Sequence, residues 1–436
     1  MRTSVTISLQ NPSEFKKQLL QWAQQFREVV YLDSNSYNRA YSSYDAVLAA
    51  DALTSIKTDY HNAFDDLKVY QQTTKDWIFG YLSYDLKNDT EDLKSQNFDG
   101  LGFADLFFFQ PKKLFLLKGN QLEVRYLHMC DDELDEDISE ITNYELRIIS
   151  PSTINHQPPT ILQRIPKTSY LEKVGRMLEH IHRGDIYEAN FCMEFYSEDA
   201  VIDPLSVFEN LNAISEPPFA VFCKHGKQYL LCASPERYLR KEGDKIITQP
   251  IKGTARRSTD AVEDDAIKQE LYANEKERSE NIMIVDLVRN DLSRTAAKGS
   301  VEVEELCGAY TFKQVHHLIS TVVSQADAQY SPVDIIKASY PMGSMTGAPK
   351  ISAMQIIEKL EESRRGLYSG AVGYFTPDGD FDFNVVIRSI LYNEDHQYVS
   401  FSVGSAITSL SDPEKEYEEC LLKGHAMRRV LEDGVQ

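Results

Sequence analysis

The sequence predicts an α+β fold in which antiparallel hairpins and helices both contribute. Residues 113–124 predict two short apolar strands that turn at Gly119 and Asn120, a pair that suits a tight hairpin. Residues 169–183 repeat apolar side chains every three or four positions, as an amphipathic helix does. The chain has 436 residues, of which 42% are hydrophobic, so it can bury an extensive core in one large fold or in two or three domains.

The N-terminal part of the chain is predicted to be rich in strands. Residues 12–30 space their apolar side chains as a helix does, and a short strand follows at 29–32. Aromatic runs at 77–84 and 106–109 favour strands, because aromatic side chains pack well on a pleated surface. The acidic run 131–140 predicts a solvated helix or loop surface.

A connection between two units is predicted at 150–167, where periodicity is lost and proline and polar residues concentrate. This composition places a boundary after residue 155. It separates a strand-rich N-terminal subdomain, residues 1–155, from a larger unit, residues 156–436. The second unit is expected to open with the helix at 169–183 and a strand at 185–192.

Lys252 is the first candidate for chemistry. It lies between an apolar run and a Gly-Thr turn, and Arg256 and Arg257 follow closely. Neighbouring positive charge would lower the pKa of the amine and favour nucleophilic attack, although a surface lysine at a strand end is the simpler alternative. A strand at 229–234, a turn at 242–244 and a returning strand at 245–248 predict a hairpin that brings Glu236 roughly opposite Lys252.

Two predicted helices each offer a pair of glutamates on one face. Residues 277–292 predict a largely buried helix, because apolar side chains nearly encircle it. A second helix is predicted to begin at Pro413, with Asp412 as its N-cap. The four carboxylates belong to Glu277 and Glu280 in the first helix and to Glu416 and Glu419 in the second, which also carries Lys423. Oxygen-only sets of this kind suit Mg²⁺, but glutamate pairs at helical spacing are also common on solvated faces.

Three further features are candidates for ligand binding. The Gly-rich loop 341–350 leads into a helix at 351–360 and offers backbone amides for an anion. Arg388 interrupts an apolar strand predicted at 383–390, after a strand at 366–375, so this arginine is either paired or binds a ligand. His317, in an apolar run, is on these grounds a hydrogen-bonded core residue more readily than a ligand.

Composition excludes several classes of protein. The chain carries 46 basic and 67 acidic residues, a net charge of −21, which argues against a nucleic-acid binder. Its six cysteines are scattered without zinc spacing, as expected of core thiols in a reducing compartment. No signal peptide and no apolar run of transmembrane length is visible, so no membrane association and a cytoplasmic location are expected.

Six sequence blocks, in this order, resemble the chorismate-utilising enzymes. This family includes component I of anthranilate synthase and of aminodeoxychorismate synthase, as well as the isochorismate and salicylate synthases. The blocks are Ser-Pro-Glu-Arg-Tyr (234–238), Pro-Ile-Lys-Gly-Thr (250–254), the helix segment 280–292, Gly-Ser-Met-Thr-Gly-Ala-Pro-Lys (343–350), Tyr-Ser-Gly-Ala-Val-Gly-Tyr (368–374) and the segment 411–419. The resemblance implies a two-layer antiparallel β-sheet sandwich with helices on the outside, and a chorismate-binding catalytic domain in residues 156–436.

The resemblance also assigns roles to residues. It implies Mg²⁺ on Glu280 and Glu419 with Glu277 and Glu416 in support, and Glu236 as general acid and base. It raises His317 from a core residue to a catalytic one. The substrate-binding positions that it implies are Thr254, Thr346, Gly347, Ala348, Tyr368, Arg388, Gly404 and Lys423.

Position 252 divides the family. Anthranilate synthases resemble this chain but have alanine there, whereas lysine resembles the members that make 4-amino-4-deoxychorismate for para-aminobenzoate and folate synthesis. In the implied mechanism Lys252 attacks C2 of chorismate while Glu236 protonates the leaving C4 hydroxyl, and ammonia then adds at C4. The isochorismate- and salicylate-forming members carry a base lysine where this chain has Glu188, which argues against those activities.

The resemblance leaves alternatives and one departure. The chain has no glutaminase segment, so ammonia is expected from a separate glutaminase subunit, although free ammonium could replace it. Ala406 stands where the family has glycine, and residues 31–34 resemble a segment that forms a tryptophan pocket in relatives. Component I of anthranilate synthase, which also releases pyruvate, and a non-catalytic chorismate-binding subunit are the alternative functions.

Overall fold

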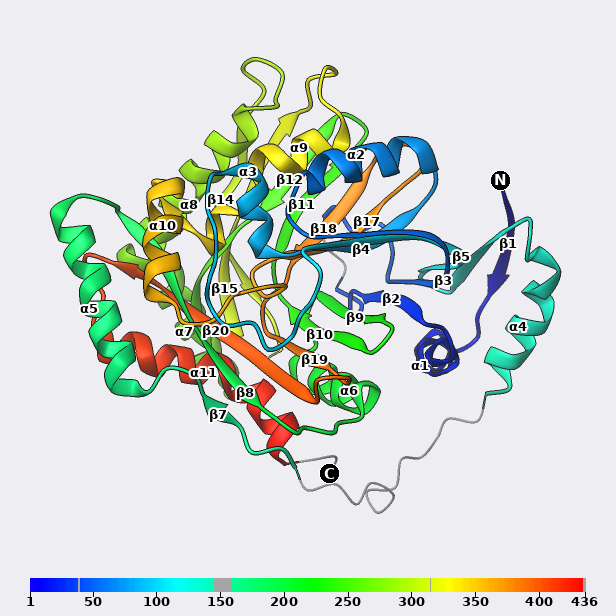
Figure 1. Cartoon of the computed structure of the whole chain (residues 1–436), viewed down its shortest axis with the longest axis horizontal. Coiled ribbons are helices and arrows are strands. Elements are labelled where there is room, and N and C mark those ends of the chain that lie inside the picture. The colour runs from blue at the N-terminus through cyan, green and yellow to red at the C-terminus, as the bar shows by residue number, and fades with distance from the viewer. Residues whose placement is uncertain (38–39, 145–157, 314, 434–436) are drawn as a thin grey trace.

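Twenty strands join into one antiparallel network in the computed structural model, which describes residues 1–37, 40–144, 158–313 and 315–433 (Figure 1). The strands are β1 (Arg2–Ser8), β2 (Glu28–Asp33), β3 (Ala46–Thr58), β4 (Ile78–Leu82), β5 (Leu106–Lys118), β6 (Gln121–Leu127), β7 (Leu162–Gln163), β8 (Glu188–Ser197), β9 (Phe219–His225), β10 (Gln228–Ser234), β11 (Arg237–Glu242), β12 (Lys245–Gln249), β13 (Ile251–Arg256), β14 (Glu302–Thr311), β15 (Val315–Gln325), β16 (Gly347–Ala348), β17 (Ala371–Phe375), β18 (Phe381–Val385), β19 (Ser389–Asn393) and β20 (Tyr398–Thr408).

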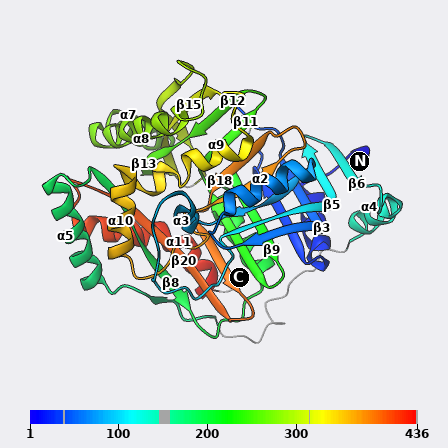
Figure 2. The same ribbon diagram turned by 45° about the horizontal axis from the view of Figure 1, so that its top comes forward.

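Helices cover the outside of this network in the described part of the chain (Figures 1 and 2). They are α1 (Pro12–Trp22), α2 (Ala63–Thr74), α3 (Lys87–Thr90), α4 (Leu134–Thr142), α5 (Lys167–Arg183), α6 (Pro204–Ser215), α7 (Ala261–Ala273), α8 (Glu275–Ser293), α9 (Pro332–Ser339), α10 (Lys350–Leu360) and α11 (Pro413–Glu432). The α+β class is therefore confirmed. Among the described residues, no helix combines the length and the apolar composition that a bilayer span requires.

The packing of alternate strand residues confirms the two-layer arrangement. In β4, Phe79 and Tyr81 belong to an apolar core in which every side chain comes from a strand or a loop. Their neighbours Ile78 and Leu82 point to the opposite face and join a core that includes residues of α2, α8 and α9. A third core lies under α1, α4, α5, α6, α10 and α11. Because side chains alternate along a strand, one core fills the space between the sheet layers and two lie beneath the outer helices.

Strands from the two ends of the chain share this network. N-terminal β4 pairs with β17, and β2 pairs with β9. The proposed boundary after residue 155 lies outside the described residues. The predicted hairpin with its turn at Gly119 and Asn120 is present as β5–β6, in which Lys118 faces Gln121.

The structure corrects three details of the predicted elements. The hairpin partner of β12 is β11, not the segment 229–234, which forms the separate strand β10. The strand predicted at 383–390 is split into β18 and β19 by a turn in which Arg388 has a φ of +53°. Helix α8 is buried along one side only, because Ile282, Asp286 and Arg289 are exposed on the other side. An apolar side chain on a helix is thus a poor guide to complete burial.

Candidate active site

The centre of the site is a buried ion pair between Lys252 and Glu188. Lys252 is the second residue of β13, Glu188 opens β8, and the Nζ of Lys252 lies 2.9 Å from Oε1 of Glu188. The Lys252 side chain is 12% exposed and the Glu188 side chain 0%. Oε2 of Glu188 is also buried and has no hydrogen-bond partner among the described residues. The two segments are 64 residues apart in sequence and meet only through the fold.

The charge around Lys252 contradicts one expectation. Burial acts to lower the pKa of the amine, but the carboxylates of Glu188, Glu280 and Glu236 outweigh it, so the pKa is raised. The predicted lowering by neighbouring arginines is wrong because both arginines are engaged elsewhere. Arg256 pairs with Glu263 at 3.2 Å, and Arg257 pairs with Asp264 at 2.8 Å.

Glu236 lies near Lys252, and the hairpin between them is β11–β12 instead of the predicted one. Glu236 follows β10, precedes β11, and is 3% exposed. Its backbone N–H donates to Oγ of Ser234 at 3.2 Å, which fixes the bend between the strands. Burial raises the pKa of its carboxyl group to about 7, although hydrogen bonds from Ser344 and the Ile251 amide and the charge of Lys252 oppose the rise. A carboxylic acid with this pKa can give and take a proton near neutral pH.

Glutamates of α8 and α11 approach one another beside this pair. Burial raises the pKa of Glu280 to about 7, and burial together with the charge of Glu419 raises that of Glu277. Burial opposes ionisation of Glu419 too, but Lys423 lies 2.6 Å away and keeps the pKa of Glu419 low. Glu416 is buried one turn before Glu419.

The donor chemistry of these glutamates fits a hard divalent cation such as Mg²⁺. Glu277 and Glu280 are half-buried and the Glu419 side chain is 49% exposed, and carboxylates that repel one another are stabilised when a cation joins them. The side chains are not arranged as a complete ligand set, because within the described ranges no three aspartate, glutamate, histidine or cysteine side chains lie close enough together to hold a metal ion. Oε1 of Glu419 is engaged by Lys423, which lies 2.6 Å away.

A neighbouring cavity brings together three residues predicted from the resemblance. His317, Arg388 and Lys423 line it, next to Pro235, which precedes Glu236. Burial lowers the pKa of the Arg388 guanidinium, and among the described residues no carboxylate forms an ion pair with it. A half-buried cation without such a partner suits an anionic ligand.

His317 and Thr254 are neighbours across two paired strands. Nδ1 of His317 lies 3.0 Å from Oγ1 of Thr254 and 3.2 Å from the carbonyl oxygen of Gly253. The ring therefore has the hydrogen bonds expected of a core histidine, and it also borders the cavity. Its catalytic role stays a prediction.

The Gly-rich loop supports Glu188 from behind. Gly347 and Ala348 form β16, which pairs with Ala189 and Glu188 of β8. A Cβ atom on Gly347 would lie 2.1 Å from the Glu188 carbonyl oxygen, so only glycine permits this approach. The Thr346 hydroxyl is buried and hydrogen-bonds within the loop, 3.2 Å from the Gly343 carbonyl oxygen.

The remaining predicted positions surround the same strands. Lys423 donates to the Gly404 carbonyl oxygen at 3.0 Å, and a Cβ on Gly404 would lie 2.5 Å from Sγ of Cys192. Ala406 pairs with Asn190, two residues beyond Glu188. Tyr368 is buried in the core between the layers, and this burial raises the pKa of its hydroxyl well above the usual value.

Sequence reasoning missed two members of the site. It treated Glu188 only as a replacement for another family's lysine and did not predict its ion pair. It also missed Ser344, whose side chain hydrogen-bonds the Glu236 carboxyl group. Position within the Gly-rich loop was the available signal for Ser344, whereas the pairing of β8 with the loop was not visible in the sequence.

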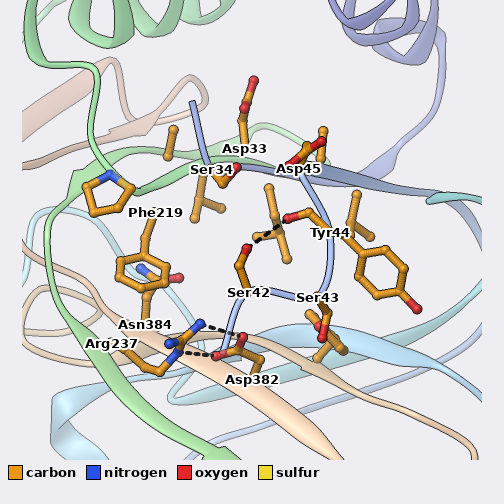
Figure 3. A pocket seen from close by; sticks show the side chains of 17 residues that line it. Asp33, Ser34, Ser42, Ser43, Tyr44, Asp45, Phe219, Arg237, Asp382 and Asn384 are labelled. Carbon is orange, nitrogen blue, oxygen red and sulfur yellow. Dashed lines mark hydrogen bonds and ion pairs between the residues drawn. The ribbon is translucent and has the colours of Figure 1, made fainter. Parts of the chain in front are cut away.

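A second pocket lies beside the segment that resembles a tryptophan pocket (Figure 3). Its lining includes Ser34, Phe219 and Arg237, and Arg237 pairs with Asp382 at 2.9 Å. Asp33 also borders the pocket, but Lys16 lies 2.9 Å from its carboxylate and the Tyr31 hydroxyl donates to it at 2.7 Å.

The chain is similar to known proteins over most of its length. The model of a family described as chorismate binding enzymes matches residues 19–429. The chain is 32% identical over 368 residues to aminodeoxychorismate synthase component 1 of Bacillus subtilis, covering 81% of this chain and 76% of that protein. It is 34% identical over 367 residues to anthranilate synthase component 1 of Thermus thermophilus, covering 81% and 77%. The crystal structure of anthranilate synthase component I from Streptococcus pneumoniae superposes with a TM-score of 0.76 at 25% identity, covering 90% of this chain and 95% of that one.

Proposed function

Because this chain belongs to the chorismate-binding enzyme family, we propose that it is the synthase component of an aminodeoxychorismate synthase. The reaction converts chorismate and ammonia into 4-amino-4-deoxychorismate and water. The observation that carries the proposal is a buried amine, Lys252, beside a carboxyl group, Glu236, whose pKa of about 7 makes it an acid and a base at neutral pH.

The two residues divide the chemistry. The Lys252 amine forms a bond to C2 of chorismate, the ring double bonds shift, and the C4–O bond breaks as Glu236 supplies the proton that turns the hydroxyl into water. Ammonia then bonds to C4, the double bonds shift back, and the bond between C2 and Lys252 breaks. Glu236 takes the proton that the new C4 amine loses, which restores its acid form.

Cationic side chains bind the carboxylates of the substrate in this proposal. Arg388 and Lys423 border the cavity next to Glu236 and are suited to a dianion. Glu280 and Glu419, with Glu277 and Glu416 in support, would hold Mg²⁺. When bound, the ion supplies positive charge for a substrate carboxylate and for charge that develops as the bonds shift.

The source of ammonia belongs to the proposal as well. We expect a separate glutaminase subunit to deliver it, and free ammonium to replace it in solution. The product would then serve para-aminobenzoate and folate synthesis in the cytoplasm. Similarity to the Bacillus subtilis protein named aminodeoxychorismate synthase component 1 supports this assignment.

Anthranilate synthase component I is the second candidate. The Thermus thermophilus protein of that name is as similar to this chain as the Bacillus subtilis protein, at 34% against 32% identity. Lys252 is the feature that favours the first candidate, because a covalent step at C2 needs a nucleophile that the alanine of the anthranilate synthases does not supply.

A product assay separates the two candidates. The purified chain is incubated with chorismate, Mg²⁺ and ammonium, and products are followed by liquid chromatography and mass spectrometry together with a pyruvate assay. The proposal expects the mass of 4-amino-4-deoxychorismate without pyruvate. Anthranilate with stoichiometric pyruvate would overturn it, and no turnover at all would favour a binding subunit.

A further inference from the structure

We propose that Glu188 is the proton acceptor of Lys252, and that transfer of a proton from Nζ of Lys252 to the carboxylate of Glu188 releases the nucleophile. This inference rests on the proposed function, because it gives Lys252 a nucleophilic role. It adds a residue that the proposed chemistry did not assign.

The need for such an acceptor follows from the charge of Lys252. Its pKa is raised, so at neutral pH the side chain is an ammonium ion without a lone pair for attack. A proton must leave before the bond to C2 forms. Glu188 accepts the hydrogen bond of this ammonium at 2.9 Å, within the range in which a general base acts.

The setting of Glu188 allows it to accept this proton without leaving an unpaired buried charge. Its side chain is fully buried, and its second oxygen has no hydrogen-bond partner among the described residues. The charge on the carboxylate is therefore compensated by Lys252 at close range. When the proton moves from nitrogen to oxygen, both members of the pair become neutral, and neither is left as an unpaired buried charge.

The backbone holds Glu188 in this position from both sides. Across one edge of β8 it pairs with Ala348 of β16, and across the other with Thr408 of β20. The side chain of Asn190, two residues further along β8, donates to the Ser344 carbonyl oxygen at 2.6 Å. Glu188 is thus part of a central strand and not of a loop, which fixes its distance to β13.

The proton returns at the end of the cycle. Lys252 starts as an ammonium ion, gives one proton to Glu188, and attacks C2 as a neutral amine. Bond formation gives a charged secondary amine, which leaves as the neutral amine when ammonia displaces it. Glu188 then returns its proton to Lys252. Glu236 separately gives one proton to the departing water and takes one from the new amine, so all protons balance.

Other titratable groups face the pair. Glu236 lies between β10 and β11, Glu280 and Glu277 lie on α8, and Glu419 and Lys423 lie on α11. His317 on β15 faces Thr254 of β13. Of these groups, Glu236 also takes part in proton transfer, so its titration must be separated from that of the pair.

The pH dependence of kcat/KM in the wild-type enzyme separates the titration of Glu236 from that of the Lys252–Glu188 pair. The test measures kcat/KM for chorismate at saturating Mg²⁺ and a fixed concentration of free ammonia. If Glu188 takes the proton, kcat/KM is constant below about pH 7 and falls about tenfold per pH unit above it, as Glu236 loses its acid form. If solvent takes the proton, kcat/KM instead rises about tenfold per unit up to about pH 7 and then levels, which would overturn the proposal.

Variants supply an independent test. In E188Q the side chain keeps its size but cannot accept the proton, so we expect kcat to fall about 10²–10⁴-fold near pH 6 with little change in KM. The difference in kcat between E188Q and the wild-type enzyme should become smaller as pH rises, because the Lys252 ammonium ion then loses its proton to solvent. E188D has a carboxylate again, so its kcat/KM should once more be constant below about pH 7. The control is E194Q, which changes another buried glutamate of β8 that is paired with Arg164 at 3.2 Å.

The outcomes distinguish this inference from the proposed function. If E188Q and the wild-type enzyme are equally active, or if the ratio of their activities does not change with pH, the role of Glu188 is contradicted and the proposed function is not. Anthranilate and pyruvate as products would sink the proposed function. If E188Q does not fold, the wild-type profile still decides, because it needs no variant.

Discussion

Lys423 of α11 lies 2.6 Å from Glu419, so a cation expected to bind substrate is paired with a carboxylate expected to bind Mg²⁺. Two residues with different proposed ligands thus neutralise each other before either ligand arrives. Binding of Mg²⁺ to Glu419 would free Lys423 for a substrate carboxylate. We therefore expect binding of the ion and binding of chorismate to favour each other.

The first prediction concerns this coupling. In E419Q the Mg²⁺ concentration for half-maximal activity should rise at least about tenfold, because a charged oxygen ligand is replaced by a neutral amide. Isothermal titration calorimetry of Mg²⁺, with and without chorismate, measures the effect directly. The control is E418Q, which changes the neighbouring exposed glutamate on the same helix. Unchanged Mg²⁺ affinity in E419Q would remove Glu419 from the ligand set.

The second prediction concerns the nucleophile. K252A should lower formation of 4-amino-4-deoxychorismate by at least about a hundredfold, since the step that forms the covalent bond is lost. In the wild-type enzyme, intact-mass analysis after rapid quench without ammonium should find Lys252 carrying chorismate less one water. The matched control is K276A, which removes an exposed lysine near the same glutamates. Full activity of K252A would contradict the nucleophilic role.

The third prediction concerns stability. K252A leaves the fully buried Glu188 without its partner, and removal of one member of a buried pair costs about 3–5 kcal/mol. The double variant K252A/E188Q should recover much of this loss, because no buried charge remains. Urea unfolding of both single variants and of the double variant measures the coupling. If the losses of unfolding free energy in the two single variants add up to the loss in the double variant, the pair does not contribute as a unit.

Some of the features that these predictions test could be predicted from the sequence, and others could not. The blocks that contain Glu236, Lys252 and the α8 glutamates each lie within one short segment of the sequence. Hydrophobic periodicity and capping residues therefore sufficed to locate their strands and helices. The helix after Asp412 began at Pro413 as expected, because an N-cap and a proline at the first position are local signals. The Lys252–Glu188 pair joins segments 64 residues apart and has no local signal.

The prediction of a lowered Lys252 pKa failed for the same reason. Arg256 and Arg257 are near in sequence, but the direction of a side chain decides which charges interact. Both arginines point toward carboxylates at the start of α7, whereas Lys252 points toward β8. Spacing along the chain thus singled out Lys252 as a candidate and misjudged the charges around it.

The fourth prediction concerns pH and Glu236. Its folded-state pKa of about 7 lies above the value in an unfolded chain, so the native protein binds more protons between about pH 4.5 and pH 7. Stability should therefore fall as pH rises through this window, by up to about 3 kcal/mol from this group. E236Q should abolish activity and yet unfold at a higher temperature than wild type at pH 8. A lower unfolding temperature at pH 8 would contradict the raised pKa.

The fifth prediction concerns Arg388. R388Q should raise KM for chorismate about 10–100-fold, because a charged hydrogen bond to a ligand contributes about 1.5–3 kcal/mol. Folding should be little affected, since the half-buried guanidinium forms no ion pair with a carboxylate among the described residues. Steady-state kinetics and thermal unfolding measure both effects, with R429Q on the exposed side of α11 as control. An unchanged KM would show that Arg388 does not contact the substrate.

The last prediction uses two glycines that differ in their surroundings. A Cβ at Gly347 would lie 2.1 Å from the Glu188 carbonyl oxygen and 2.8 Å from the Cα of Ala189, both backbone atoms that cannot turn aside. G347A must therefore push β16 away from β8 and displace Glu188 from Lys252. We expect loss of activity together with a lower unfolding temperature.

Gly175, in the middle of α5, provides the control, because a Cβ there meets nothing within 4 Å. G175A should keep full activity and stabilise the protein by about 0.5–1 kcal/mol, since alanine loses less backbone entropy in a helix. Together the two variants separate the general effect of an added methyl group from its effect on the ion pair. Wild-type activity in G347A would show that the catalytic position of Glu188 does not depend on this loop.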